Sequence, residues 1–548
     1  QAFLFAASRA APHSPLYVLH CTAMLQPAGF GARLGQGQQW QSWKHVGRRR
    51  APIACQLRQA LRDVTALAVA IVVLYVVVLP DTLPGAALAP PAPAHRPEAP
   101  PQSKTSTTSQ ASATVVASKR RTKVDEASLD FFASCIGGLE VVLESELRDL
   151  GVKRVRRISR GVFFSGSARS GCRALIALRT ATSVDEILGV IERPLADRDD
   201  MVSFVQRVRP WDRTISNSET LLVECKGSPN HLPAGLRQTQ LTAMSTQKAI
   251  TDVCLEKTGA RPNIELQEPD WMLRMVFHRD GAQLSRRWTG RQGGHRRGYR
   301  EDVVMHKAAL RETTAAGVLL LAGLRAGENI SFLDPMCGSG TLALEAAMIV
   351  ANIPPGLLRA ALSKSQTQAV PIQWRELLQE ELAAARSEVH VPRGLDIRGS
   401  DANPSALSLA RRCLAAIEGV VPEIRGKVTL EARSAGDATP PSRRTRVRRL
   451  ICCNPPWGVR LGKGEADPED EDADSGPPAE ESWRELADLL RRHKGEAWVL
   501  TPNPDLAKVL PLQQKAVHKV DGGPRDTPSK GAFGLQWIGY GNPTPRGV

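Results

Sequence analysis

The spacing of apolar residues predicts a first folded unit over roughly 128–298. Five apolar residues fall on one helical face ahead of a glycine, a residue type that ends helices: Leu139, Val142, Leu143, Leu147 and Leu150, then Gly151. Short apolar runs and turn residues predict further elements: strands over 160–166 and 220–225, a helix over 239–257, and a hairpin about Asp280-Gly281. This mixture predicts a small α+β unit.

A second unit, roughly 299–548, shows the pattern of an α/β domain. The stretch "ISFLDPMCGSGTLALEAAM" predicts a strand, a glycine turn and a helix that begins at Thr341. Gly338 and Gly340 let the backbone approach a ligand, and backbone N–H groups converge where the helix begins. The turn has neither the P-loop nor the GxGxxG spacing, which disfavours phosphoryl transfer and hydride transfer. We expect a nucleoside-like ligand at this turn.

Two aspartates follow later strands of the same unit. Asp401 ends a strand signal, where a carboxylate can accept both hydroxyl hydrogens of a ribose. The alternative is a helix N-cap, although Asn403 or Ser405 could cap that helix equally well. Asp437 follows a third strand and could meet the amino group of an adenine, or it could be an ordinary loop aspartate.

The stretch "RLICCNPPWG" predicts a buried strand followed by a rigid turn with two outward acceptors. Pro455 and Pro456 fix the turn and remove two backbone donors. The side-chain oxygen of Asn454 and the Pro455 carbonyl can then point outward, beside the flat face of Trp457. This set fits a planar ring that bears an amino group, because an aromatic side chain can stack on a base. We therefore expect Asn454, Pro455, Pro456 and Trp457 to form a catalytic turn.

Composition adds an expectation about the partner. The chain has 548 residues, is 42% apolar and carries a net charge of +16. That charge favours an anionic partner such as nucleic acid or an acidic membrane face, with plain basic solubility as the alternative. Seven basic residues of the first unit and the connection after it are candidate phosphate contacts, with a solvated surface as the alternative: Lys248, Arg286, Arg287, Arg291, Arg296, Arg297 and Arg300.

The ten cysteines include no CxxC pair and no Cys/His cluster. Cys452 and Cys453 are adjacent within an apolar run, which favours buried, reduced thiols. We predict a reducing compartment and no metal site.

Three N-terminal segments differ in composition from the folded units. Residues 1–62 contain several arginines and no Asp or Glu, which is typical of an organellar targeting segment, and we favour a plastid over a mitochondrion. The apolar run 64–79 is slightly short for a membrane span, so it could be an anchor, part of a two-stage targeting signal or an error in the gene model. Residues 80–118 are rich in Pro, Ala, Ser and Thr, and we expect 63–127 to hold this apolar run and a disordered linker.

Taken together, these motifs resemble class I S-adenosylmethionine-dependent methyltransferases that act on amino nitrogens. More specifically, the chain is similar to the THUMP-domain large-subunit rRNA methyltransferase L family, over about residues 130–548. The resemblance is carried by "CIGGLEVVLESEL", "RPN", "HRRGYR", "ALRETTAAG", "DPMCGSGTLALEAAM", "NPPWG" and "KVDGGPRDTPSK". It implies an α+β ferredoxin-like and THUMP unit that binds RNA, followed by an α/β, Rossmann-like methyltransferase domain.

The resemblance also implies roles for particular residues. S-adenosyl-L-methionine would lie on the loop formed by Asp334, Pro335, Cys337, Gly338 and Gly340, with Asp401 at its ribose, Asp437 at its adenine and Asn454 beside it. The turn from Asn454 to Trp457 would hold the target guanine, and the basic residues of the first unit would contact RNA. Arg311 and Glu312 match a family helix before the first strand.

Two features depart from the family pattern. Trp457 replaces the commoner tyrosine, and an acidic stretch over 465–481 reads as a disordered insert. The expected activity is methylation of the exocyclic N2 of a guanine in large-subunit rRNA. The alternatives are a tRNA guanine-N2 methyltransferase, an adenine-N6 or glutamine-amide methyltransferase, and a non-catalytic RNA-binding factor of ribosome assembly.

Overall fold

A computed structural model describes most of the chain beyond residue 127. The described ranges are 128–227, 232–291, 293–294, 296–300, 309–362, 369–441, 447–457, 479–493, 495–521 and 534–541. All of them belong to one compact unit, Thr105–Val548. The segments 1–62, 64–79 and 80–118 lie outside the described residues, so the predictions for targeting, membrane anchoring and the linker stay predictions.

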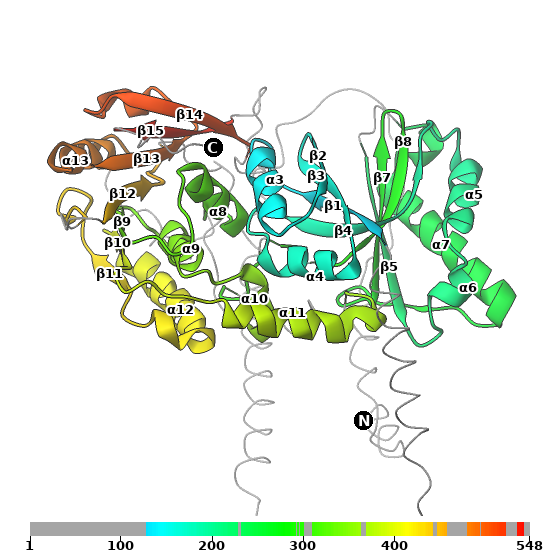
Figure 1. Cartoon of the computed structure of the whole chain (residues 1–548). Helices are drawn as coiled ribbons and strands as arrows, with labels where there is room; N and C mark the ends of the chain where they lie inside the picture. Colours follow the sequence, from blue (N-terminus) through cyan, green and yellow to red (C-terminus); the bar gives the residue numbers. More distant parts are fainter. Residues whose placement is uncertain are drawn as a thin grey trace, which may run out of the picture. The chain divides into compact units, whose positions relative to one another are not determined.

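The N-terminal part of the described chain is an α+β structure, as the apolar pattern predicts, and we call it the front layer. Its elements are β1 (Leu129–Ser134), α3 (Glu140–Asp149), β2 (Arg154–Ile158), β3 (Gly161–Gly166), α4 (Ala168–Ala177) and β4 (Ser183–Ile191). Strands β2, β3, β1 and β4 lie side by side and antiparallel (Figure 1). Phe131 and Ala133 of β1 are fully buried, while Phe132 between them lies on the other face and stays partly exposed.

A second set of elements extends the same sheet. It consists of α5 (Arg198–Val208), α6 (Trp211–Thr214), β5 (Thr220–Lys226), α7 (Thr239–Thr258), β6 (Asn263–Ile264), β7 (Trp271–His278) and β8 (Gly281–Arg287). Strand β4 pairs with β8, so one eight-stranded sheet runs in the order β2-β3-β1-β4-β8-β7-β5-β6. The predicted helix over 239–257 and the predicted hairpin about Asp280-Gly281 are confirmed by α7, β7 and β8.

The remaining elements form a seven-stranded, mostly parallel sheet with helices. They are α8 (Glu312–Leu321), β9 (Ile330–Asp334), α9 (Thr341–Val350), α10 (Pro355–Leu362), α11 (Arg375–Ser387), β10 (Asp396–Asp401), α12 (Pro404–Val420), β11 (Val428–Ala432), β12 (Arg448–Cys453), α13 (Ala479–Arg492), β13 (Glu496–Thr501), β14 (Gln514–Val520) and β15 (Leu535–Tyr540). The sheet order is β11-β10-β9-β12-β13-β15-β14. Strands β9 to β13 are parallel, and β15 runs antiparallel to both β13 and β14.

The central strand β9 and the helix that follows it are buried along their whole length. Every residue of β9 and of α9 is buried, which is how an apolar run folds when both faces of a parallel sheet are covered. Among the described residues, no single helix is long and apolar enough to cross a membrane, and only α9 with α10, bent by 111°, passes such a test as a pair.

The segment of the parallel domain between α9 and β10 packs against the front layer. Between α9 and β10 the chain forms α10 and α11, and Trp374, Leu377 and Leu378 there share one core cluster with Phe131. Arg169 and Arg173 of α4 both pair with Glu381 of α11, the second at 2.7 Å between Nε and Oε2. The two folded parts are therefore joined through a common core.

The acidic insert was predicted slightly too long. Its last residues, 479–481, form the first turn of α13, while 465–478 lies outside the described residues. Acidic side chains such as Glu480 and Glu481 are favourable where a helix begins, because backbone N–H groups are unpaired there.

Candidate active site

The candidate site lies where the parallel sheet reverses its order. From the central strand β9 the chain adds β10 and β11 on one side, and then places β12 and β13 on the other. Ligands of open α/β sheets bind at the carboxyl ends of the strands beside such a switch point. Asp334 ends β9, Asp401 ends β10 and Asn454 follows β12, so the sheet brings three predicted site residues to one edge.

The glycine loop after β9 is shaped by backbone conformation. Gly338 has φ +52° and Gly340 has φ +81°, values that side-chain-bearing residues rarely adopt. A Cβ at Gly338 would meet nothing within 4 Å, whereas one at Gly340 would lie 3.1 Å from the Ala410 side chain of α12. The loop therefore has open space in front of Gly338 and close packing behind Gly340.

Asp401 ties this loop to the neighbouring strand. Its Oδ2 accepts a hydrogen bond from the Gly338 N–H at 2.7 Å, and its Oδ1 accepts one from the Asn403 N–H at 2.9 Å. The capping alternative is resolved by Asn403, whose side-chain oxygen accepts from the Ser405 N–H at 2.9 Å and caps α12. The two oxygens of a carboxyl group offer more acceptor positions than these two hydrogen bonds use, so Asp401 keeps capacity for a ligand hydroxyl.

Asp334 is the most deeply buried carboxyl of the site. Its side chain is only 2% exposed, and its Oδ1 accepts from the Met336 N–H at 3.4 Å. Burial raises the pKa of Asp334 well above the ordinary value, and the nearby Asp401 raises it further. Pro335 and Cys337 of the same loop are also buried, and burial raises the pKa of the Cys337 thiol.

The turn after β12 contains two buried polar atoms that lack a partner. Pro455 is buried, and the Pro456 carbonyl accepts a hydrogen bond from the Trp483 Nε1–H of α13 at 2.9 Å. The Asn454 Oδ1 and the Trp457 Nε1 are buried without any hydrogen-bond partner among the described residues. Leaving such an atom unpaired costs about 1–3 kcal/mol, so orphaned atoms at a strand end point to a missing ligand.

Asp437 lies apart from this buried set. It follows β11, is exposed, and its Oδ2 accepts from the Ser434 hydroxyl at 3.3 Å. The structure thus places Asp437 at an outer strand of the same edge. Its contact with an adenine stays a prediction.

Most of the predicted RNA-contacting arginines do not lie on the surface, and this corrects the expectation for them. Arg286 is 2% exposed, and its guanidinium stacks on the Trp271 ring at 3.6 Å. Arg287 is 8% exposed, 3.5 Å from an Asp185 carboxylate oxygen, and Arg297 is fully buried. A buried guanidinium with internal partners is not available to a phosphate.

The same correction applies to Arg300, whereas three other candidates are surface residues. The Arg300 side chain is 10% exposed and lies 3.6 Å from a Glu312 oxygen. Lys248, Arg291 and Arg296 are exposed. RNA contact by these three residues stays a prediction.

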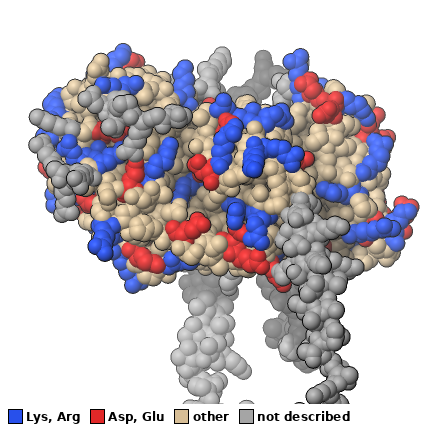
Figure 2. All heavy atoms as spheres, viewed as in Figure 1, with Lys and Arg blue, Asp and Glu red and all other residues tan. Residues whose placement is uncertain are grey.

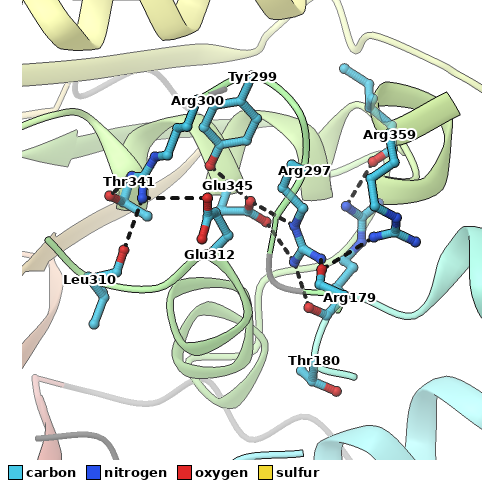
Figure 3. Close-up of polar contacts among 12 residues, drawn as sticks. Arg179, Thr180, Arg297, Tyr299, Arg300, Leu310, Glu312, Thr341, Glu345 and Arg359 are labelled. Carbon is cyan, nitrogen blue, oxygen red and sulfur yellow. Dashed lines mark hydrogen bonds and ion pairs between the residues drawn. The ribbon is translucent and has the colours of Figure 1, made fainter. Parts of the chain in front are cut away.

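Figure 3 shows the surroundings of two of these arginines, Arg297 and Arg300. Arg297 donates from Nε to the Glu345 Oε1 at 3.2 Å and from Nη2 to the Oε2 at 3.4 Å, and the Tyr299 hydroxyl donates to the same carboxylate at 3.2 Å. Arg297 also donates to the Arg179 carbonyl at 2.5 Å. Glu345 belongs to α9 and Arg179 follows α4, so this stretch holds the two folded parts together.

Sequence reasoning missed a basic strand on the front layer. Strand β2 presents exposed Arg154, Arg156 and Arg157, and the run 153–160 contains no acidic residue. Arg156 lies over the Phe163 ring at 4.7 Å. Figure 2 shows Lys and Arg side chains gathered over β2 and β3, in the upper middle of the view. The signal in the sequence was this acid-free run.

The adjacent cysteines at the end of β12 are reduced in the structure. Cys452 and Cys453 are fully buried, as predicted, and form no disulfide with a described residue. Within the described ranges, no group of three or more His, Cys, Asp and Glu side chains could hold a metal ion.

Comparison with known proteins identifies the three parts in order. Residues 130–184 match the RlmL ferredoxin-like domain, residues 196–286 the THUMP domain, and residues 297–470 the RMKL-like methyltransferase domain. These matches follow the structural division into β1 to β4, α5 to β8, and the parallel sheet.

Curated relatives are similar to this chain over most of its length. A ribosomal RNA large subunit methyltransferase K/L of Cellvibrio japonicus is 30% identical over 410 residues, which is 71% of this chain and 49% of that protein. A Synechocystis protein named as a candidate RNA methyltransferase is 28% identical over 72% of this chain and 94% of its own length. The chain spans about half the length of the K/L relatives it matches.

Solved structures share the fold. A candidate methyltransferase crystallised with S-adenosylhomocysteine has a TM-score of 0.59 at 20% identity, over 76% of this chain and 99% of its own. A candidate methylase from Clostridium difficile has a TM-score of 0.59 at 23% identity, over 77% of this chain and 100% of its own. The fold and the strand-end site define a class I methyltransferase domain. The three matched family models together describe a THUMP-domain methyltransferase, and this chain is similar to them in the same order.

Proposed function

We propose that this chain is an S-adenosylmethionine-dependent methyltransferase that modifies the exocyclic N2 of a guanine in large-subunit rRNA. The observation that carries the proposal is the buried Asn454 Oδ1 at the carboxyl end of β12, which has no hydrogen-bond partner among the described residues. An acceptor at the end of β12 fits a ligand whose N–H groups donate hydrogen bonds. The names of the K/L relatives support large-subunit rRNA as the substrate.

The residues at the strand ends fit S-adenosylmethionine. Asp401 fits the ribose hydroxyls, because both of its oxygens are ordered by backbone N–H groups and keep free lone pairs. The open space in front of Gly338 would leave room for the ligand beside the loop. Asp437, which follows β11 in the same sheet, would approach the adenine. When bound, the cofactor supplies an electrophilic methyl group.

The turn from Asn454 to Trp457 would orient the amine of the base. The amine lone pair is delocalised into the ring, so the free base is a weak nucleophile. Hydrogen bonds to the Asn454 Oδ1 and the Pro455 carbonyl would draw the N–H groups to one side and aim the lone pair. Positioning of this kind is worth up to about 7–11 kcal/mol. The same two acceptors stabilise the positive charge that develops on the nitrogen.

Trp457 would receive the base after it leaves its stack. Stacking on an aromatic side chain is worth about 1–3 kcal/mol per base. The indole packs partly against the core of the domain, and the Pro456 carbonyl is fixed by Trp483, so the turn is held rigidly before the base arrives. A rigid turn loses little conformational entropy on binding.

The substitution Asn454→Ala tests this role. It removes one acceptor and leaves the glycine loop intact, so turnover should fall by at least about a hundredfold, while the dissociation constant of S-adenosylmethionine stays within about threefold of that of the wild type. Isothermal titration with S-adenosylmethionine and a methylation assay on rRNA, both with the full chain, measure the two effects. Turnover equal to that of the wild type would remove Asn454 from the mechanism.

The organellar setting is part of the proposal and depends on the acid-free residues 1–62. A tagged full chain found only in the cytosol would remove that part, and would leave the chemistry untouched.

A further inference from the structure

The connection between the RNA-binding unit and the methyltransferase domain passes through a buried cluster of charges. Arg297 and Glu345 are fully buried, and Tyr299 is 2% exposed. Arg297 also donates from Nη1 to the Gly294 carbonyl at 2.9 Å. Since the guanidinium and the carboxylate satisfy each other, the start of this connection is fixed between the ferredoxin-like part and α9.

The Arg300 side chain links the same connection to the first residue of α9. Its Nη2 donates to the Thr341 hydroxyl, and its Nη1 donates to the Leu310 carbonyl at 3.2 Å (Figure 3). The guanidinium also lies 3.6 Å from Glu312, the first residue of α8. One side chain therefore joins the beginnings of two helices.

Thr341 continues directly from the glycine loop. It is the first residue of α9, 5% exposed, and follows Gly340, which needs its positive φ. On the other side of Gly340, the Gly338 N–H donates to Asp401. A shift at Thr341 would therefore move the loop on which the proposed cofactor rests.

We infer that Arg300 is a positioning residue for the cofactor loop, acting through the Thr341 hydroxyl. This inference rests on the proposed function, since it assigns the loop to S-adenosylmethionine. Arg300 lies only three residues after Arg297, whose guanidinium is held by the ferredoxin-like part. The loop is thus fixed relative to the RNA-binding unit as well as to its own domain.

Two substitutions of one residue test the inference. Thr341→Val keeps the branched shape and deletes the acceptor, and Thr341→Ser keeps the hydroxyl. The dissociation constant of S-adenosylmethionine, measured by titration of the full chain, should rise about tenfold in Thr341→Val and stay within about twofold in Thr341→Ser. The dissociation constant for rRNA should be unchanged in both variants.

A matched control is available in the same core. The Thr313 hydroxyl of α8 is fully buried and has no partner among the described residues, so Thr313→Val makes the same chemical change without deleting a hydrogen bond. It should leave S-adenosylmethionine affinity unchanged. Arg300→Lys provides a second test, because an ammonium group cannot reproduce the fork that reaches both helices, and it should weaken cofactor binding like Thr341→Val.

The outcomes separate the two proposals. Wild-type affinity in folded Thr341→Val and Arg300→Lys would overturn the positioning role and leave the proposed function standing. A wild-type chain that binds no S-adenosylmethionine would overturn the proposed function itself.

Discussion

The individual residues of the site differ most in burial, that is, in the fraction of each residue that stays exposed to water in the folded chain. Asp334 and Asp401 end neighbouring strands, yet only Asp334 is buried to 2% exposure. Desolvation disfavours the ionised form, and the Asp401 carboxylate adds to that effect, so the pKa of Asp334 is raised. Burial of Asp334 therefore lowers the free energy of unfolding, by an amount that depends on pH.

Replacing Asp334 by Asn should remove that dependence. A carboxyl whose pKa is raised on folding contributes most stability below its ordinary pKa, about 3.9, and loses it as pH rises through the folded value. The free energy of unfolding of Asp334→Asn should therefore increase relative to that of the wild type as the pH rises from about 4 towards the folded pKa. The gain should be about 1.4 kcal/mol for each pH unit in that window. Urea unfolding of both chains without cofactor measures the difference.

The exposed Asp437→Asn variant controls for the loss of one negative charge. If the free energies of unfolding of wild type and Asp334→Asn changed with pH in parallel, burial of the Asp334 carboxyl would not lower stability as the pH rises.

Residue identity was predictable at this site, but burial was not. Asp401 and Asn454 were found because their types and strand-end positions suit the chemistry. Arg286 and Arg297 were misplaced because a sequence does not show whether an arginine meets a phosphate or an internal carboxylate. Here Glu345, 48 residues away along the chain, is the partner of Arg297.

At the scale of elements, strand β2 is the best candidate for contact with RNA. Arg154 is exposed and donates to the Ser128 hydroxyl at 2.9 Å, and the guanidinium of Arg156 lies over the Phe163 ring. Both side chains point from an edge strand of the eight-stranded sheet. Their charge is available for phosphate groups.

The double substitution Arg154→Gln and Arg156→Gln should weaken RNA binding through electrostatics. Each lost phosphate contact lowers the slope of log affinity against log salt by about one, so the slope should fall by about two. Filter binding of rRNA fragments at several salt concentrations measures it. Arg386→Gln removes a partly exposed arginine of α11 that pairs with Glu423 at 2.7 Å, and its slope should match that of the wild type. An unchanged slope in the double variant would exclude β2 from the interface.

Helices α3 and α7 were both predictable from the sequence, but the polar residues that a helix buries were not. Helix α3 buries the Val142, Leu143 and Leu147 that define its apolar stripe. Helix α7 instead buries three threonines, of which Thr242 and Thr246 donate to main-chain carbonyls one turn earlier. Their hydroxyls are satisfied locally, so a polar residue type occupies a core position without a signal in the pattern.

At the scale of the molecule, the two folded parts could be predicted, but not how they join. The change from short strands to a strand–glycine–helix unit placed the boundary near 298. The structure shows that the connection is buried there, and that Trp374 and Leu377 from the parallel domain complete the core of the ferredoxin-like part. Contacts between residues so far apart in sequence leave no local pattern.

The proposed chemistry depends on an amino-bearing purine meeting the free acceptor after β12. The most direct measurement is nucleoside mass spectrometry of large-subunit rRNA incubated with the full chain and S-adenosylmethionine labelled in its methyl group. We expect label in N2-methylguanosine with the wild type and its loss with Asn454→Ala. Label in N6-methyladenosine, or none in either reaction while S-adenosylmethionine binds, would contradict the proposal.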